Sequence, residues 1–192
     1  MFKTFRDYIT QTGSFTAKEL EMMAATSVTR QVRKKQFLQQ EGEVSISMNF
    51  ILKGCMRMYR VDEQGHEHIL TFAIENWWIS DKESFMTGNP SKYFIDALED
   101  CQLLMWQKED FGRLLQQIPA FFVSIQKFVV AKSIALHDRL YETLSYSADE
   151  KYHNFIKTYP DVFNRVPLQM IASYLGVSRE TLSRVRNQHA YK

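Results

Sequence analysis

The chain of 192 residues is 45% apolar and 24% charged, so it can bury a sizeable core and is not a disordered tail. Its formal net charge of +2 gives no reason, by itself, to expect a nucleic-acid or membrane partner. The charge is unevenly spread, because Glu180 is the one acid after Phe163. The basic residues of that segment are Arg165, Arg179, Arg184, Arg186 and Lys192. Positive charge is therefore concentrated at the carboxyl end.

Cysteine usage and the amino terminus indicate the compartment. Cys55 and Cys101 follow no metal-ligand or CxxC spacing, so we expect two reduced cysteines in a cytoplasmic protein. The amino terminus lacks an apolar run followed by a small-residue cleavage site. No stretch is expected to reach the length of a membrane span, and no membrane partner is predicted.

The first 26 or so residues are predicted to be helical, with Thr16 and Glu19 placed as a capping box. From Val28 to about Leu104 the pattern changes to short runs of aromatic and branched residues separated by glycines, which is typical of an antiparallel sandwich or barrel. The segment from Asp62 to Gly65 predicts a hairpin loop, because glycine can supply the positive φ that such a turn needs.

A long helix is predicted after Pro119. Its apolar seam has spacings of three, four or seven residues, and comprises Phe122, Ile125, Val129, Leu136, Leu140 and Leu144. A seam of this length either packs wholly on its own domain or faces a second copy of the chain. We expect the second arrangement, because a 3.5-like repeat suits a two-helix interface.

Two short helices joined by a turn are predicted between Pro167 and Val185. The inner side of the first comprises Met170 or Ile171, Ala172 and Leu175. Gly176 permits a left-handed turn, Val177 fills the junction, and Ser178 can cap the second helix. That helix is expected to bury Leu182 and Val185, as the second helix of a helix-turn-helix does.

The opposite face of this second helix is polar and mostly basic. It contains Arg179, Glu180, Ser183, Arg184 and Asn187, which are related by one or four positions. In a major groove, arginine can donate two hydrogen bonds to guanine and glutamate can accept from cytosine. The alternative is a solvated helix face in which Glu180 pairs with Arg184.

The segment IASYLGVSRETLSRV resembles the helix-turn-helix of the Crp/Fnr family, which contains the cyclic-AMP receptor protein and the fumarate-nitrate reduction regulator. Upstream segments resemble the landmarks of that family in the same order, over about residues 15–188. They are Glu41-Gly42-Glu43, Leu52-Lys53-Gly54, the Asp62 to Gly65 hairpin, Ala97-Leu98-Glu99-Asp100, and Glu109-Asp110-Phe111 ahead of Leu114, Leu115 and Pro119.

The resemblance implies an α+β chain with three parts. These are a cyclic-nucleotide-binding-like antiparallel β-roll effector domain with flanking helices (1–118), a dimerisation helix (119–145), and a helix-turn-helix DNA-binding domain (146–192). The wing is expected to be truncated, because the residues after Arg184 are too few for a strand pair. Phosphate contacts would then come from helix ends, from the segment around Asn164 and Arg165, or be absent. The implied partners are palindromic double-stranded DNA, a second copy of the chain, and RNA polymerase.

Carried over residue by residue, Arg179, Glu180 and Arg184 match the base-reading positions of the cyclic-AMP receptor type. Glu180, Ser183 and Arg184 match the triplet of the fumarate-nitrate reduction type, so a half-site with a TGA core is predicted. The full predicted DNA-contacting set is Ser178, Arg179, Glu180, Ser183, Arg184, Arg186 and Asn187.

The effector cassette departs from the family pattern. The phosphate-binding arginine falls on Ser91, Lys92 follows it, and no arginine occurs between Arg60 and Arg113. Since a lysine cannot reproduce the two directed bonds of arginine, we do not expect cyclic AMP to be the effector, and no cofactor is predicted. The candidate pocket for an unknown effector is Trp78, Ser84, Ser91, Lys92, Leu136 and His137. The alternative for Trp77, Trp78 and Phe85 is core packing.

Other chemistries fit less well. An iron–sulfur cluster needs four thiolates, and the chain has two cysteines. His66 and His68 would project from one side of a strand, but the further ligands of a metal-binding barrel enzyme are missing, so a solvated hairpin end is preferred. We therefore expect a transcription regulator and no enzyme or metal site. The alternatives are a small-molecule sensor whose helix-turn-helix binds protein, and a β-barrel enzyme.

Overall fold

The computed structural model describes residues 2–189. The helices are α1 (Phe2–Ile9), α2 (Ala17–Ala25), α3 (Lys82–Thr87), α4 (Lys108–Gln117), α5 (Pro119–Ser145), α6 (Ala148–Thr158), α7 (Pro160–Phe163), α8 (Leu168–Leu175) and α9 (Arg179–His189). The strands are β1 (Val28–Val32), β2 (Phe37–Gln39), β3 (Ser47–Lys53), β4 (Met56–Val61), β5 (Glu67–Ala73), β6 (Phe94–Ala97) and β7 (Cys101–Gln107). The predicted α+β class, with an antiparallel β-roll, a long helix and carboxyl-terminal helices, is confirmed.

The β-roll consists of two antiparallel sheets. One has the strand order β1-β7-β3 and the other β2-β6-β4-β5. The predicted hairpin joins β4 to β5, and Gly65 has a φ of 86°. The carboxylate of Asp62 closes the loop by accepting hydrogen bonds from the backbone N–H groups of Gln64 and His66, at 3.0 and 2.8 Å.

An aromatic core joins the flanking helices to the first sheet. Trp78 lies in it with Phe5, Phe50 and Trp106, and Phe85 packs in the same cluster. The indole of Trp106 satisfies its N–H by donating to the Met23 carbonyl at 2.9 Å, so α2 is tied to β7. The core-packing interpretation of Trp78 and Phe85 is therefore confirmed.

Both cysteines are buried free thiols, and they belong to two different core clusters. Burial raises the pKa of Cys55 to about 12 and that of Cys101 to about 11. Neither thiol is therefore activated as a nucleophile.

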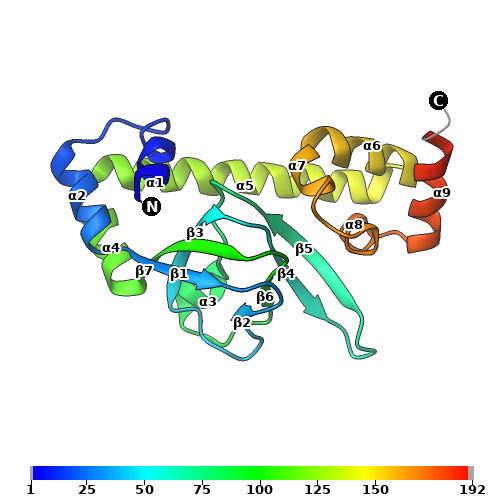
Figure 1. The fold of residues 1–192 in the computed structure, drawn as a ribbon, viewed down its shortest axis with the longest axis horizontal. Coiled ribbons are helices and arrows are strands. Elements are labelled where there is room, and N and C mark those ends of the chain that lie inside the picture. Colours follow the sequence, from blue (N-terminus) through cyan, green and yellow to red (C-terminus); the bar gives the residue numbers. More distant parts are fainter. Residues whose placement is uncertain (1, 190–192) are drawn as a thin grey trace.

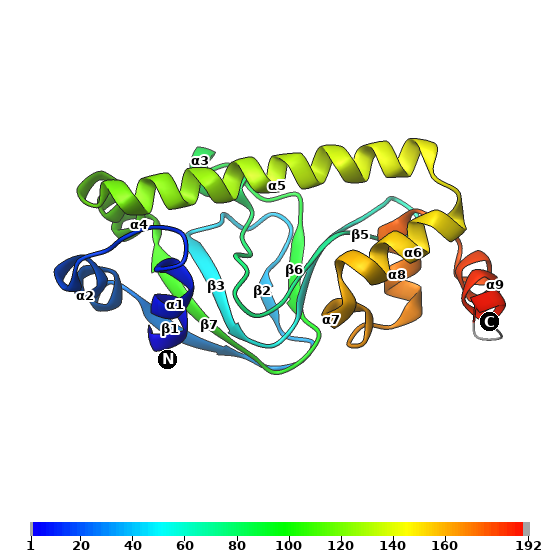
Figure 2. The same cartoon turned by 90° about the horizontal axis from the view of Figure 1, so that it is seen from above.

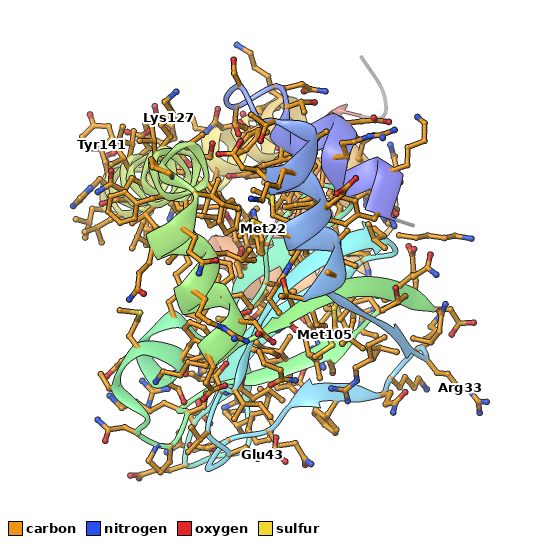
Figure 3. All side chains as sticks on the ribbon, turned by 90° about the vertical axis from the view of Figure 1, so that its left-hand side faces the viewer. Met22, Arg33, Glu43, Met105, Lys127 and Tyr141 are labelled. Atoms are coloured by element: carbon orange, nitrogen blue, oxygen red, sulfur yellow. The ribbon has the colours of Figure 1, made fainter. Side chains whose placement is uncertain are left out.

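Helix α5 runs across the β-roll and continues to the carboxyl-terminal helices (Figures 1 and 2). Phe121 and Ser124 are buried, and Ile125 packs on the aromatic core, so this member of the predicted seam faces its own domain. The other seam residues are exposed or half-buried. Figure 3 shows Lys127 and Tyr141 on the side of α5 that points away from the sheets.

By length and composition alone, α5 could cross a membrane, and only 11% of its most apolar window is buried. The expectation that no stretch reaches the length of a span is therefore wrong on these criteria. The difference arises because Lys127 and Lys132 interrupt the sequence without making the average polar. The same composition is expected of a helix whose outer face packs on another helix.

The carboxyl-terminal helices α6 to α9 enclose their own apolar residues and also pack on the β-roll. Phe155 and Tyr174 contact Phe72 of β5, with ring centroids 6.4 and 5.6 Å apart. One core cluster therefore runs from β4 and β5 through to Leu182 and Val185 of α9. The position of α8 is consequently fixed by β5 as well as by α5, and α9 packs on α8 and α6.

Candidate nucleic-acid interface

The turn between α8 and α9 has the geometry that its sequence predicts. Gly176 has a φ of 66°, its N–H donates to the Ser173 carbonyl at 3.2 Å, and the N–H of Val177 donates to Ala172 at 3.1 Å. These two bonds form a Schellman motif, which ends α8 and satisfies two of its last carbonyls. A Cβ on Gly176 would meet no atom within 4 Å, so glycine is required here by the backbone conformation and not by space.

Helix α9 is fixed at its start and along its inner side. Ser178 caps it, since the hydroxyl accepts a hydrogen bond from the N–H of Thr181 at 3.1 Å. Leu182 and Val185 are buried, at 0% and 7% exposure, against residues of α6 and α8. Ile171, Ala172 and Leu175 are the buried residues of α8, which decides between Met170 and Ile171 in favour of the second.

The opposite face of α9 is open to solvent at the end of the molecule (Figures 1 and 2). Of the seven predicted DNA-contacting residues, Ser183 is half-buried and the other six are exposed. Within residues 2–189 no ion pair joins Glu180 to Arg184, so the alternative of a self-paired helix face is absent from this structure. The side chains of Arg179, Arg184 and Arg186 likewise form no hydrogen bond or ion pair with a described residue.

Glu180 is held as an anion at the start of the helix. Hydrogen bonds from its own backbone N–H and from Ser178, with the neighbouring Arg179, lower the pKa of its carboxyl group. An ionised carboxylate is a hydrogen-bond acceptor only, which suits an amino group on a base edge and excludes a phosphate as its partner.

Arg165 is occupied within the chain. Its guanidinium donates to Glu75 at 2.7 and 3.1 Å and to Glu99 at 2.9 and 2.7 Å. Glu75 follows β5 and Glu99 follows β6, so this cluster joins the β-roll to the loop before α8. In this arrangement Arg165 is not available for a DNA phosphate, and Asn164 donates to the Pro160 carbonyl at 3.1 Å.

Helix α8 is hydrogen-bonded to the edge strand β5. The hydroxyl of Ser173 donates to the Glu67 carbonyl at 2.7 Å and accepts from the Ile69 N–H at 3.0 Å. Arg139 of α5 donates to the carbonyls of Ile69 and Leu70 and, at 2.7 Å, to that of Tyr174. Because these groups satisfy the exposed edge of β5, they protect it from pairing with other strands. The roles of Ser173, Arg139 and Arg165 could not be predicted from the sequence, since their partners in the β-roll lie 66 or more residues away.

The six residues of the predicted effector pocket are not brought together by any described contact. Trp78 is in the aromatic core, and Lys92 is exposed and pairs with Glu83 at 3.4 Å. The buried hydroxyl of Ser84 accepts from the Ser45 N–H and donates to the Asn89 carbonyl, at 2.9 and 2.6 Å. Ser91 is buried and bonded to the backbone of Tyr93, while Leu136 and His137 are exposed on α5.

These positions do not fit a cyclic nucleotide held in the manner of the family. Ser91, where the resemblance would place the phosphate-binding arginine, is 3% exposed, and its hydroxyl is used by neighbouring backbone groups. Lys92 is at the surface, where it pairs with the exposed acid Glu83. A buried phosphodiester would therefore lack the paired donors that it needs.

His66 and His68 lie at the exposed end of the β4–β5 hairpin. Both rings contact the same oxygen of Asp62, at 3.2 and 2.8 Å, and together with backbone N–H groups they lower the pKa of that carboxyl group. In the part of the chain that the structure describes, no three His, Cys, Asp or Glu side chains are placed as metal ligands.

Comparison with known proteins gives the same architecture. A family model described as the cyclic nucleotide-binding domain matches residues 29–118. The chain is 26% identical over 155 residues to the nitrogen fixation regulation protein FixK of Bradyrhizobium diazoefficiens, which covers 75% of this chain and 64% of FixK. It is 24% identical over 164 residues to the cAMP-activated global transcriptional regulator CRP of Salmonella typhimurium, covering 79% and 77% of the two chains. The structure of the global regulator CLP from Xanthomonas campestris matches with a TM-score of 0.72 at 15% identity, over 92% of each chain.

The chain therefore has the architecture of a protein in which a domain of the cyclic nucleotide-binding type is followed by a long helix and a helix-turn-helix. The chain is related to the Crp/Fnr transcription regulators, such as FixK and CRP. It spans 64% of the length of FixK, so the activities of the whole relatives are considered below as proposals.

Proposed function

We propose that this chain is a cytoplasmic transcription regulator that binds a palindromic DNA duplex as a homodimer, with α9 in the major groove. The observation that carries the proposal is the combination of exposed Arg179 and Arg184 without internal partners and a helix that is rigidly capped and packed behind them. A base-reading helix needs such preorganised donors, because groups already paired would have to be released first.

The homodimer is supported by the outer side of α5. Leu136, Leu140 and Leu144 are 64%, 56% and 79% exposed there, and Val130 and Ile134 extend the apolar surface. A surface of this kind on one long helix is suited to a second copy of itself, which would place two α9 helices on one face of a duplex. RNA polymerase is the proposed further partner, by analogy with transcription regulators related to this chain.

The effector differs from cyclic AMP in this proposal, since the cassette lacks the phosphate partner. A thermal-shift assay with cyclic AMP and cyclic GMP tests this point, because a tight ligand raises the unfolding temperature by mass action. We expect no shift with either nucleotide, and a clear shift with cyclic AMP would contradict our interpretation of Ser91.

Selection of bound duplexes from a random pool tests the DNA-binding proposal. We expect enrichment of two-fold symmetric sites with a TGA core in each half, and loss of enrichment in the Arg179→Ala and Arg184→Ala variants. Affinity for the selected site should also fall steeply with salt, because phosphate contacts release counterions. Enriched sites without symmetry would argue against both the dimer and the groove docking.

A further inference from the structure

A cavity of about 370 Å³ lies between α5 and the carboxyl-terminal helices, outside the β-roll. From α5 it is lined by Ala135, Asp138, Arg139, Tyr141 and Glu142. The other walls are formed by Asn154, Phe155 and Thr158 of α6 and by the end of α8. Its volume is within the range of small-molecule sites. Because α8 leads directly into the turn of the helix-turn-helix, this cavity touches both the long helix and the predicted DNA-reading unit.

Two carboxylates line this cavity from α5, and neither forms an ion pair with a described residue. Asp138 and Glu142 are one helical turn apart, and both line the cavity. The carboxylate of Asp138 has no hydrogen bond or ion pair with any described residue, and that of Glu142 accepts only from the neutral amide of Asn154. Burial, then repulsion from Asp138, raises the pKa of Glu142 although Arg139 is nearby.

Arg139 also lines the cavity, but its guanidinium is hydrogen-bonded to backbone carbonyls and not to these acids. Its N–H groups donate to the carbonyls of β5 and of Tyr174, and its guanidinium lies 3.8 Å from the centre of the Tyr174 ring. The Arg139 side chain therefore connects α5 to β5 and α8. An anionic ligand in this cavity would lie against two carboxylates, whereas a cation would be attracted by both.

Aromatic rings form much of the remaining wall. Phe155, Tyr159 and Tyr174 contact one another with ring centroids 5.3 to 6.4 Å apart, and Tyr146 lies at the rim, where its ring meets that of Tyr141. The faces of such rings attract ammonium groups, and this attraction is strongest where water is displaced. Rings and carboxylates together are the surroundings that organic cations prefer.

We propose that this cavity binds an organic ammonium ion, which Asp138 and Glu142 attract and the aromatic wall holds. A second copy of the chain on the outer side of α5 would leave the cavity open. Leu144, the most exposed apolar residue of that side, follows Ala135 by nine positions, which is about two and a half turns and therefore the opposite face. The bound cation would also be an effector, since it would fix α8 relative to α5. This effector role rests on the proposed function.

Titration calorimetry on the full chain without DNA tests the binding site directly. Spermidine and choline are the probes, and glutamate is the anionic control at the same ionic strength. We expect saturable binding of at least one of the two cations, at one per chain, and none of glutamate. The absence of saturable binding with both cations would overturn the proposal, and it would leave DNA binding untouched.

The matched variants distinguish the cavity from general attraction to acids. Asp138→Asn with Glu142→Gln should weaken cation binding at least tenfold while keeping side-chain size and the contact with Asn154. Glu41→Gln with Glu63→Gln removes the same charge from exposed residues elsewhere and should leave the affinity unchanged. Tyr146→Leu, which keeps both carboxylates, should weaken the binding of choline. Equal affinity in the two double variants would contradict the site.

The effector role is tested with the selected duplex and choline, which is a monovalent cation and competes little for DNA phosphates. Fluorescence anisotropy should show at least a threefold change in operator affinity at saturating choline, and no change in the Asp138→Asn, Glu142→Gln variant. An unchanged affinity with the cavity saturated would overturn the effector role. Failure to bind any duplex would instead overturn the proposed function, and the calorimetric result would stand.

Discussion

Single residues of α9 divide into those that would read bases and those that would contact phosphates. Arg184 lies four positions after Glu180 on the exposed face and is free to form two hydrogen bonds with guanine. Arg184→Ala should therefore cost about 1–3 kcal/mol of binding free energy and relax the preference at one position of the half-site.

Arg186→Ala is the control for this variant, because Arg186 is also exposed but lies on the rim of the face. It should weaken binding to all sequences alike and reduce the salt dependence by about one counterion per contact. Competition binding against half-sites with single base changes measures both effects. A uniform loss in Arg184→Ala would show that this residue contacts the backbone.

The backbone at Gly176 gives a prediction about stability. Since its φ is 66° and a Cβ would meet no atom, Gly176→Ala should destabilise the protein only through the left-handed conformation, by about 1–2 kcal/mol. Gly112→Ala is the matched control, because it also adds a methyl group in open space but lies within α4, where alanine should stabilise by about 0.5–1 kcal/mol. Urea unfolding compares the two, and effects of the same sign would contradict the assignment.

At the scale of elements, α5 carries the clearest prediction. Leu140→Glu with Leu144→Glu places two charges in the proposed helix–helix interface, so the variant should be a monomer at concentrations where the unmodified chain is a dimer. Ile46→Glu with Met86→Glu changes two equally exposed apolar residues outside α5 and should leave the dimer intact. Sedimentation velocity measures both. If the Leu140→Glu, Leu144→Glu variant remained a dimer, the interface would have to lie elsewhere.

Elements and their local caps were predictable because their causes are local in sequence. The capping box of Thr16 and Glu19, the Asp62 hairpin, and the glycine turn before Ser178 all depend on residues within five positions of one another. The seam of α5 was predicted less well, since periodicity did not reveal that Ile125 turns inward to the aromatic core.

The arrangement of the whole molecule was not predictable from the pattern of residues. Nothing in the sequence distinguishes Phe155 and Tyr174 from other apolar helix residues. In the structure they line the cavity and also belong to the core cluster that joins β5 to the carboxyl-terminal helices. The role of Arg165 was not predictable either, and the short wing had made its segment one possible source of phosphate contacts. Its partners are acids 66 and 90 residues earlier, and only the folded β-roll brings them within reach.

The cluster of Arg165 with Glu75 and Glu99 leads to a prediction about the docking of the helix-turn-helix on the β-roll. Arg165→Gln should lower the free energy of unfolding by about 1–2 kcal/mol, because charged hydrogen bonds at a partly buried site are lost. It should also speed amide exchange in β5 and α8. Arg113→Gln, which removes an exposed pair with Asp110, is the control and should change neither quantity.

This cluster also makes the docking sensitive to acid. Burial raises the pKa of Glu75, but hydrogen bonds from Arg165 and Gly54 outweigh it, so the pKa falls below its usual value of 4.5. Hydrogen bonds from Arg165 likewise lower the pKa of Glu99. Since both pKa values are lower in the folded chain, their stabilisation is complete above about pH 4.5 and is lost as the pH falls through the lowered values. Unfolding measured from pH 7 to pH 3 should therefore bring Arg165→Gln and the unmodified chain together at the acidic end. A stability difference that stays constant over this range would show that Arg165 acts through packing and not through its charge.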